Sequence, residues 1–185
     1  KICAIIKHNN PCGCASDQDG LVAYLNALEG DPLSAFGGVV ALNYKLSSEI
    51  AKEIIKTFYE VVLTPEIDNE AKKILATKKN LRVIIHSPEE NEKNLSPTFM
   101  QKTFLLQDEN PSFLSKDDLK IVTKVKPTES EINNLLFANQ VCKHVKSNAI
   151  VISNNKKTLG IGGGQTSRVG SSEIACKNAN KFFPR

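Results

Sequence analysis

The 185-residue sequence lacks a long apolar run, a block of basic residues and an even set of cysteines. No stretch is long enough to span a bilayer, and no charged start leads through an apolar segment to a small-residue cleavage site. Of the five cysteines, only Cys12 and Cys14 are close together, which argues against a disulfide framework. We therefore expect a cytoplasmic protein with reduced thiols and no membrane partner.

The charge balance is nearly even, with a net charge of +4, and the lysines are spread through many polar segments without interleaved aromatic residues. Nucleic-acid binding would need a clustered basic face, so we expect no nucleic-acid partner, whereas small anionic ligands stay compatible. A hydrophobic content of 41% allows one domain or two small ones. The chain starts at Lys1 inside an apolar run and its one methionine is Met100, so we expect an excerpt of a longer polypeptide.

Apolar runs alternate with helical patterns along the chain, and this alternation predicts an α/β fold. Strands are predicted over residues 1–6, 39–42, 60–64, 81–85, 119–125, 149–153 and 158–161. Helices are predicted over 21–28, 49–58 and 68–77, from 127 towards 144, and after 168. Thr128 is the expected N-cap of the fourth helix, and Glu131 completes a capping box. The polar, proline-interrupted segment 86–118 is expected to be irregular apart from an extended stretch at 103–107.

Lys7 and His8 follow the first predicted strand, at the kind of strand end where α/β proteins place their chemistry. The unperturbed pKa of histidine lies near neutrality, and a neighbouring ammonium favours the neutral, proton-accepting imidazole. Neighbours on a regular strand face opposite ways, so both side chains reach one pocket only if the chain bends. Asn9, Asn10 and Pro11 favour such a bend. Lys7 and His8 are thus the first candidates for an electrostatic partner and a base.

The glycine-rich segment 160–164 lies between a predicted strand and a predicted helix, where backbone N–H groups can hold an anion. Its spacing matches neither the phosphate loop nor the dinucleotide fingerprint. A tight turn that needs positive φ explains the local pattern about as well, although Arg168 favours ligand binding. A non-catalytic nucleotide-binding module that uses this loop is therefore an alternative function.

Cys12 and Cys14 lie near His8 and invite comparison with zinc-dependent nucleobase deaminases. In this sequence the two cysteines are one residue apart, and no glutamate follows the histidine. One histidine and a Cys-x-Cys pair make a poor tetrahedral site, so we expect no metal and no zinc. A metal-dependent deaminase relative stays a third hypothesis.

Four segments, taken together and in this order, resemble the AICAR transformylase family, which forms part of the bifunctional purine biosynthesis proteins. They are IKHNNPCG at 6–13, DPLSAFGG at 31–38, KHVKSNAIV at 143–151 and GIGGGQTSR at 160–168. The resemblance runs through nearly the whole chain. It implies transfer of a formyl group from the co-substrate 10-formyltetrahydrofolate to the 5-amino group of AICAR, with an IMP cyclohydrolase domain elsewhere in the parent protein.

The resemblance also implies a fold of two cytidine-deaminase-like three-layer α/β/α units, zinc-free and incomplete at both ends. The first unit would cover 1–126 and the second 127–185. In this family the protein is a homodimer with its active sites at the interface. The expected partners are therefore AICAR, 10-formyltetrahydrofolate and a second copy of the chain.

Matching positions assign roles to seven residues. His8 would be the base that takes a proton from the attacking amine, while contacting AICAR, and Lys7 would stabilise charge on the formyl oxygen. Asn148 would hold polar groups of the substrate and help to position that oxygen. Considered locally, without the resemblance, Gly37 is explained as an uncrowded strand entry and Glu60 as a solvated charge.

The same matching places Gly37 and Glu60 at the nucleotide, with Glu60 on the ribose, and Arg168 and Val169 beside the folate. Some of the family's pattern is missing. The arginine-tyrosine phosphate contact before the first strand and the C-terminal aromatic, aspartate, arginine and histidine contacts are absent. The glycine-containing turn before residue 105 is replaced by Lys-Thr-Phe.

Overall fold

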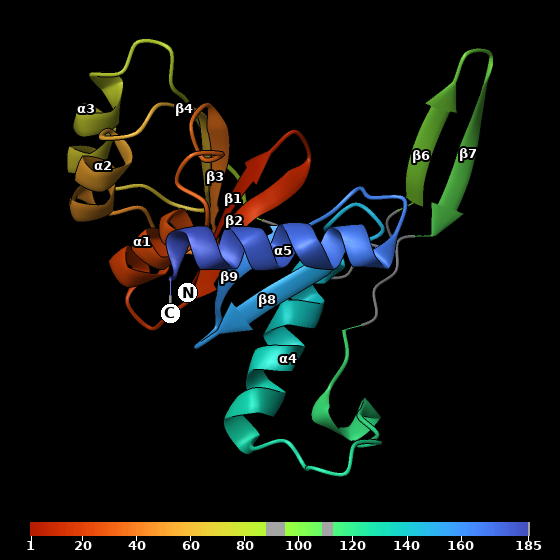
Figure 1. The fold of residues 1–185 in the computed structure, drawn as a ribbon. Coiled ribbons are helices and arrows are strands. Elements are labelled where there is room, and N and C mark those ends of the chain that lie inside the picture. The colour runs from red at the N-terminus through yellow and green to blue at the C-terminus, as the bar shows by residue number, and fades with distance from the viewer. Residues whose placement is uncertain (88–94, 109–112, 185) are drawn as a thin grey trace.

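The computed structural model describes residues 1–87, 95–108 and 113–184, and in these residues it forms a mixed α/β fold (Figure 1). The strands are β1 Ile2–Lys7, β2 Asn10–Ser16, β3 Gly38–Leu42, β4 Tyr59–Thr64, β5 Arg82–Ile85, β6 Leu95–Met100, β7 Thr103–Asp108, β8 Ile150–Asn154 and β9 Lys157–Gly162. The helices are α1 Gly20–Gly30, α2 Ser48–Ile54, α3 Asn69–Ala76, α4 Glu129–Cys142 and α5 Arg168–Phe182, with a 3-10 turn at Lys116–Asp118. The predicted α/β class is confirmed.

Seven strands form one sheet in the order β5-β4-β3-β1-β2-β9-β8. The pairings of β3 with β4 and of β4 with β5 are parallel, and the other four are antiparallel. β2 joins β9 through the pair Ala15 and Lys157, and the Cys14 amide donates to Thr158 Oγ1 over 3.0 Å. The sheet thus includes strands from both predicted units, and the boundary at residue 126 stays a prediction.

Helices lie on both faces of the sheet. The larger hydrophobic core packs α1, α2 and α3 against one face, where Ile5, Val40 and Val62 are fully buried. On the opposite face α4 packs against Cys14 through Phe137 and Val141. Among the described residues, no helix has the length and apolar character needed to cross a membrane.

The local structure differs from the sequence-based expectations in some segments and agrees with them in others. The strand predicted over 119–125 is wrong, because these residues are exposed and lie outside every strand. After β1 the chain turns back at once, and Asn10–Ser16 forms β2, a strand that the sequence pattern did not predict. The predicted extended stretch at 103–107 is confirmed as the second strand of the β6–β7 hairpin, whereas the first strand, Leu95–Met100, lies in the segment that was expected to be irregular. Residues 88–94 and 109–112 of the predicted irregular segment lie outside the described residues.

Candidate functional site

Lys7 ends β1 with its ammonium held against the turn that precedes β3. Lys7 Nζ donates to the carbonyl oxygens of Phe36 and Gly37 at 2.9 and 2.8 Å. The turn is itself fixed, because the Gly37 amide donates to the Phe58 carbonyl over 2.7 Å. An ammonium has three N–H bonds, so these two carbonyls leave one for another acceptor. The charge is therefore positioned before any ligand arrives.

The backbone conformation of Gly37 favours glycine at this turn, and the residue lies close to the Lys7 ammonium. Its φ is +68°, in the left-handed region that favours glycine. A Cβ at this position would also lie 2.8 Å from Lys7 Nζ. The backbone at Gly37 is therefore approached closely by the lysine ammonium.

His8 and Asn9 form the two-residue turn between β1 and β2, with φ values of 50° and 60°. A hairpin turn with positive φ at both central positions reverses the chain tightly, and histidine and asparagine tolerate this conformation better than most residues. The bend that the sequence predicted is therefore present. Non-glycine residues in this region cost of order 1–3 kcal/mol each, and such strain gathers at functional sites.

The bend brings Lys7 and His8 to the same cavity, which has a volume of about 390 Å³. Polar groups from three other parts of the chain line it as well: Asp31 and Ser34 after α1, Gln165 before α5, and Asn178 within α5. Apolar walls come from Val145, Ile161 and Ile174. The cavity thus combines a cation, an imidazole, a carboxylate and amides in one place.

Asn148 is tied to this cavity through Gln165. Its backbone N–H and its Nδ2 both donate to the Gln165 carbonyl, each over 3.0 Å, and Ser171 Oγ donates to the Asn148 carbonyl over 2.8 Å. Asn148 does not line the cavity itself, whereas Gln165 does. The structure therefore places Asn148 one residue away from the cavity that holds Lys7 and His8.

The remaining expected residues lie outside this cavity. Glu60 is exposed on β4, next to Tyr59, which pairs with Gly38. Arg168 and Val169 form the exposed first turn of α5. Within one chain, the structure thus gathers Lys7, His8 and Gly37. Asn148 is tied to the cavity only through Gln165, and the other three expected residues lie at its periphery.

Asn10 connects the two halves of the site, although its place in the sequence predicts only a part in the bend. Its Oδ1 accepts from the Lys146 amide over 3.0 Å, and its Nδ2 donates to the His8 carbonyl over 3.2 Å. Gln165 and Asn178 were also missed. For Asn178, which lies mid-helix, the sequence carries no signal of a role in the cavity.

The two cysteines near His8 face opposite sides of the sheet. The register of β1 with β2 shifts between Ile5 and Ile6, so Cys12 is an extra residue in the ladder. Cys12 packs against the larger core and donates to the Ile5 carbonyl over 3.4 Å, whereas Cys14 belongs to the core under α4. Burial, followed by the Asp31 charge, raises the pKa of Cys12 to about 12. Its thiol is therefore protonated at neutral pH.

Because of this bulge, the side chains of Cys12 and Cys14 point to opposite faces of the sheet, so the two thiols do not lie together as a pair of metal ligands. In the residues that the structure describes, no three His, Cys, Asp or Glu side chains gather as a metal site.

The glycine-rich segment serves packing at two of its positions. A Cβ at Gly160 would lie 2.2 Å from the Ala175 carbonyl, and one at Gly162 would lie 2.0 Å from the Ser171 carbonyl. These glycines thus let α5 approach β9 closely. The N-terminus of α5 is capped by Ser167, whose Oγ accepts from the Gly170 amide over 3.0 Å. Of the loop glycines, Gly163 lines the cavity and Gly164 takes a φ of +69°.

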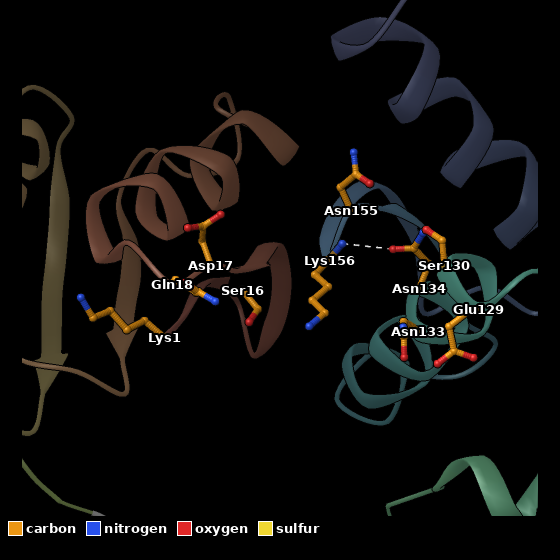
Figure 2. A pocket seen from close by; sticks show the side chains of 10 residues that line it. All are labelled: Lys1, Ser16, Asp17, Gln18, Glu129, Ser130, Asn133, Asn134, Asn155 and Lys156. Carbon is orange, nitrogen blue, oxygen red and sulfur yellow. Dashed lines mark hydrogen bonds between the residues drawn. The ribbon is translucent and has the colours of Figure 1, made fainter.

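A second, polar pocket of about 600 Å³ lies at the other end of β1 and β2 (Figure 2). It is lined by residues such as Asp17, Glu129 and Lys156, and the Lys156 amide donates to Asn134 Oδ1 over 3.1 Å. None of the expected site residues lines this pocket. The cavity beside Lys7 and His8 is therefore the candidate site.

Comparison with known proteins agrees with the four-segment resemblance. Residues 1–178 match the profile of a family described as the AICARFT/IMPCHase bienzyme. Proteins named bifunctional purine biosynthesis protein PurH from Brucella ovis, Brucella canis and Brucella melitensis are each 48% identical over 178 residues. The match covers 95% of this chain, and the chain spans about a third, 33%, of the length of these relatives.

Proposed function

Because the chain belongs to the AICARFT/IMPCHase bienzyme family, we propose that its parent protein acts in purine biosynthesis and that the Lys7–His8 cavity serves formyl transfer. The formyl donor would be 10-formyltetrahydrofolate and the acceptor the 5-amino group of AICAR. The observation that carries the proposal is the convergence of the fixed Lys7 ammonium and the His8 imidazole on one cavity.

In the proposed reaction the amine nitrogen attacks the formyl carbon and a new C–N bond forms. The His8 imidazole takes the proton that the amine loses, and the remaining N–H of Lys7 donates to the oxygen on which negative charge develops. The bond from the formyl carbon to the tetrahydrofolate nitrogen then breaks, and the protonated imidazole returns its proton to that nitrogen. A positioned base contributes roughly 10²–10⁴ in rate, and a fixed donor at the oxyanion contributes about 3–4 kcal/mol.

Asn148 would position the formyl oxygen, with its orientation set by the two bonds to the Gln165 carbonyl. Gly37 would lie close to the nucleotide, because its carbonyl oxygen accepts a hydrogen bond from the Lys7 ammonium. Glu60 would bind the ribose, and Arg168 with Val169 would contact the folate. These three lie outside the cavity within one chain, which supports the proposal that a homodimer completes the site.

The test is tetrahydrofolate release with AICAR, measured on the full-length parent and on His8→Ala. We expect turnover to fall by about 10²–10⁴, as for loss of a positioned base, while AICAR affinity stays within a few-fold. Normal turnover in His8→Ala would remove the base assignment. If the parent binds AICAR but transfers no formyl group, the alternative of a nucleotide-binding module that uses the glycine-rich loop is favoured.

A further inference from the structure

The β6–β7 hairpin is amphipathic, with its apolar side exposed. Residues directly opposite each other in an antiparallel pair share a face. The pairs Phe99 with Phe104 and Pro97 with Leu106 therefore lie on one side, together with Leu95. The other side carries four polar residues, Ser96, Thr98, Thr103 and Gln107, together with the apolar Met100 and Leu105. We call the first set the apolar face of the hairpin.

Within the described chain, little covers this apolar face. Phe99 is 80% exposed, Phe104 56% and Leu106 53%. Figure 1 shows the hairpin projecting away from the seven-stranded sheet. A two-stranded hairpin alone is marginally stable in water, and a hairpin with one apolar and one polar side normally packs its apolar side on a core. The pattern thus indicates a missing packing partner.

The seven-stranded sheet has an apolar surface that also lacks cover. One cross-strand row on this surface joins Ile6, Val39 and Val61, and the next joins Ala41 and Leu63. These five side chains are half-buried and belong to neither hydrophobic core. Strands with parallel partners are normally buried on both faces. We call these five residues the open face of the sheet.

The edges of the two apolar surfaces have features that fit each other. Beside the open face, between β1 and α4, lies a largely apolar groove of about 570 Å³ that Ile6 also lines. The first row of the open face ends at Arg82, which pairs with Val61. The apolar face of the hairpin ends at Asp108, opposite Leu95. Each surface thus carries one charged residue at its edge, and the two charges have opposite sign.

We propose that the apolar face of the hairpin packs on the open face of a second copy of the chain, and that the exchange is mutual. Each chain carries both surfaces. In a closed dimer with two-fold symmetry, the hairpin of each copy therefore covers the open face of the other copy. Asp108 of one copy would then lie near Arg82 of the other. The inference rests on the proposed function only for the existence of a homodimer, to which it adds the contact surfaces.

The first test places the photoreactive residue p-benzoylphenylalanine at position 99 of the full-length parent. Equal amounts of ¹⁴N- and ¹⁵N-labelled protein are mixed, equilibrated and irradiated, and the cross-linked peptides are identified by mass spectrometry. We expect mixed-isotope cross-links from position 99 to peptides of β1, β3 or β4. Cross-links confined to one isotope, or only to residues outside 1–185, would overturn the proposal.

The second test introduces charges on the two sides of the hairpin and measures the dimer dissociation constant by sedimentation. Phe99→Asp with Leu106→Asp is expected to raise it at least 100-fold, because the change places charges in a buried contact. The matched control, Thr98→Asp with Gln107→Asp, adds the same charges to the polar side and should change it less than threefold. Equal effects of the two double variants would contradict the proposed orientation.

A charge exchange tests the edge contact. Asp108→Lys and Arg82→Glu should each weaken the dimer several-fold, and the double variant should restore it. Independent, additive weakening in the double variant would exclude this contact. Because these readouts measure association, a parent that dimerises through the hairpin but transfers no formyl group disproves the proposed function alone. A formyl-transferring dimer insensitive to the hairpin variants disproves the interface alone.

Discussion

The side chain of Asn10 accepts a hydrogen bond from the backbone amide of Lys146, 3.0 Å away, although 136 positions separate the two residues. Asn10 follows the turn that carries His8, and Lys146 lies two positions before Asn148. One amide side chain thus fixes the spacing between the proposed base and the proposed oxygen-positioning residue. Asn10 is a positioning residue in this arrangement.

Replacement of Asn10 by alanine should lower kcat of formyl transfer about tenfold, because a net hydrogen bond of about 1.4 kcal/mol corresponds to that factor. AICAR affinity should change little, since Asn10 acts through His8. Asn10→Asp keeps the acceptor for Lys146 and should retain more activity than Asn10→Ala. The comparison variant is Asn133→Ala, because Asn133 lines the polar pocket at the other end of β1 and β2. Equal kcat values for Asn10→Ala and Asn133→Ala would refute the role.

Gly37→Ala and Gly164→Ala form a matched pair with φ values of +68° and +69°. Both should lose about 1–2 kcal/mol of stability, because alanine is strained in the left-handed region. Only the Cβ at Gly37 meets Lys7 Nζ, whereas nothing lies within 4 Å of a Cβ at Gly164. Formyl transfer should therefore fall at least tenfold in Gly37→Ala and stay near normal in Gly164→Ala. Urea unfolding and activity, measured on the same samples, separate the two effects.

Gly162→Ala should destabilise the protein by about 1–3 kcal/mol or more, as overpacking does in a rigid core. The added Cβ would lie 2.0 Å from the Ser171 carbonyl and 3.0 Å from the Ala175 amide, both in the backbone of α5. Thermal unfolding of Gly162→Ala beside Gly164→Ala is the measurement. A smaller shift in Gly162→Ala than in Gly164→Ala would show that the helix does not need this close approach.

Alkaline pH should weaken the fold through its buried thiols. Burial raises the pKa of Cys12 and of Cys14 to about 12, whereas an unfolded cysteine titrates near about 8.5. The thiol contribution to stability is therefore complete below about pH 8.5 and is lost as pH rises towards 12, because the unfolded chain releases protons that the folded chain retains.

Each thiol should steepen the fall of the unfolding free energy by up to about 1.4 kcal/mol per pH unit in this range. Urea unfolding between about pH 7.5 and 10.5 measures it. The Cys12→Ala, Cys14→Ala double variant should show a shallower fall than Cys176→Ala, whose thiol is exposed. Identical slopes for the two proteins would contradict the burial effect.

Local signals in the sequence predicted local structure well. Thr128 and Glu131 form the expected capping box of α4, with the Thr128 amide donating to Glu131 Oε2 over 2.7 Å. A cap depends on residues three positions apart, so the pattern alone specifies it. The strand at 119–125 failed for the converse reason. Its apolar residues have no neighbouring strand in the described structure. A local sequence pattern does not reveal whether a segment has a partner strand to pair with.

The candidate site was predictable only in part for a related reason. Lys7 and His8 carry a recognisable pair of chemistries, and Gly37 belongs to a recognisable motif. Asn10, Gln165 and Asn178 take their places through contacts between distant segments, which composition and periodicity do not reveal. The register shift that separates Cys12 from Cys14 is likewise a property of paired strands.

The pairing of β2 with β9 determines the order in which the parts of the cavity form. Five neighbouring strands of the sheet, β1 to β5, come from residues 2–85, whereas Cys14 meets Thr158 across 144 positions. Contacts of such long separation form late, because the intervening chain must first be closed into a loop. On the ribosome, the strands that carry Lys7 and His8 are therefore synthesised before the wall that carries Gln165, and the cavity closes only once that wall has formed.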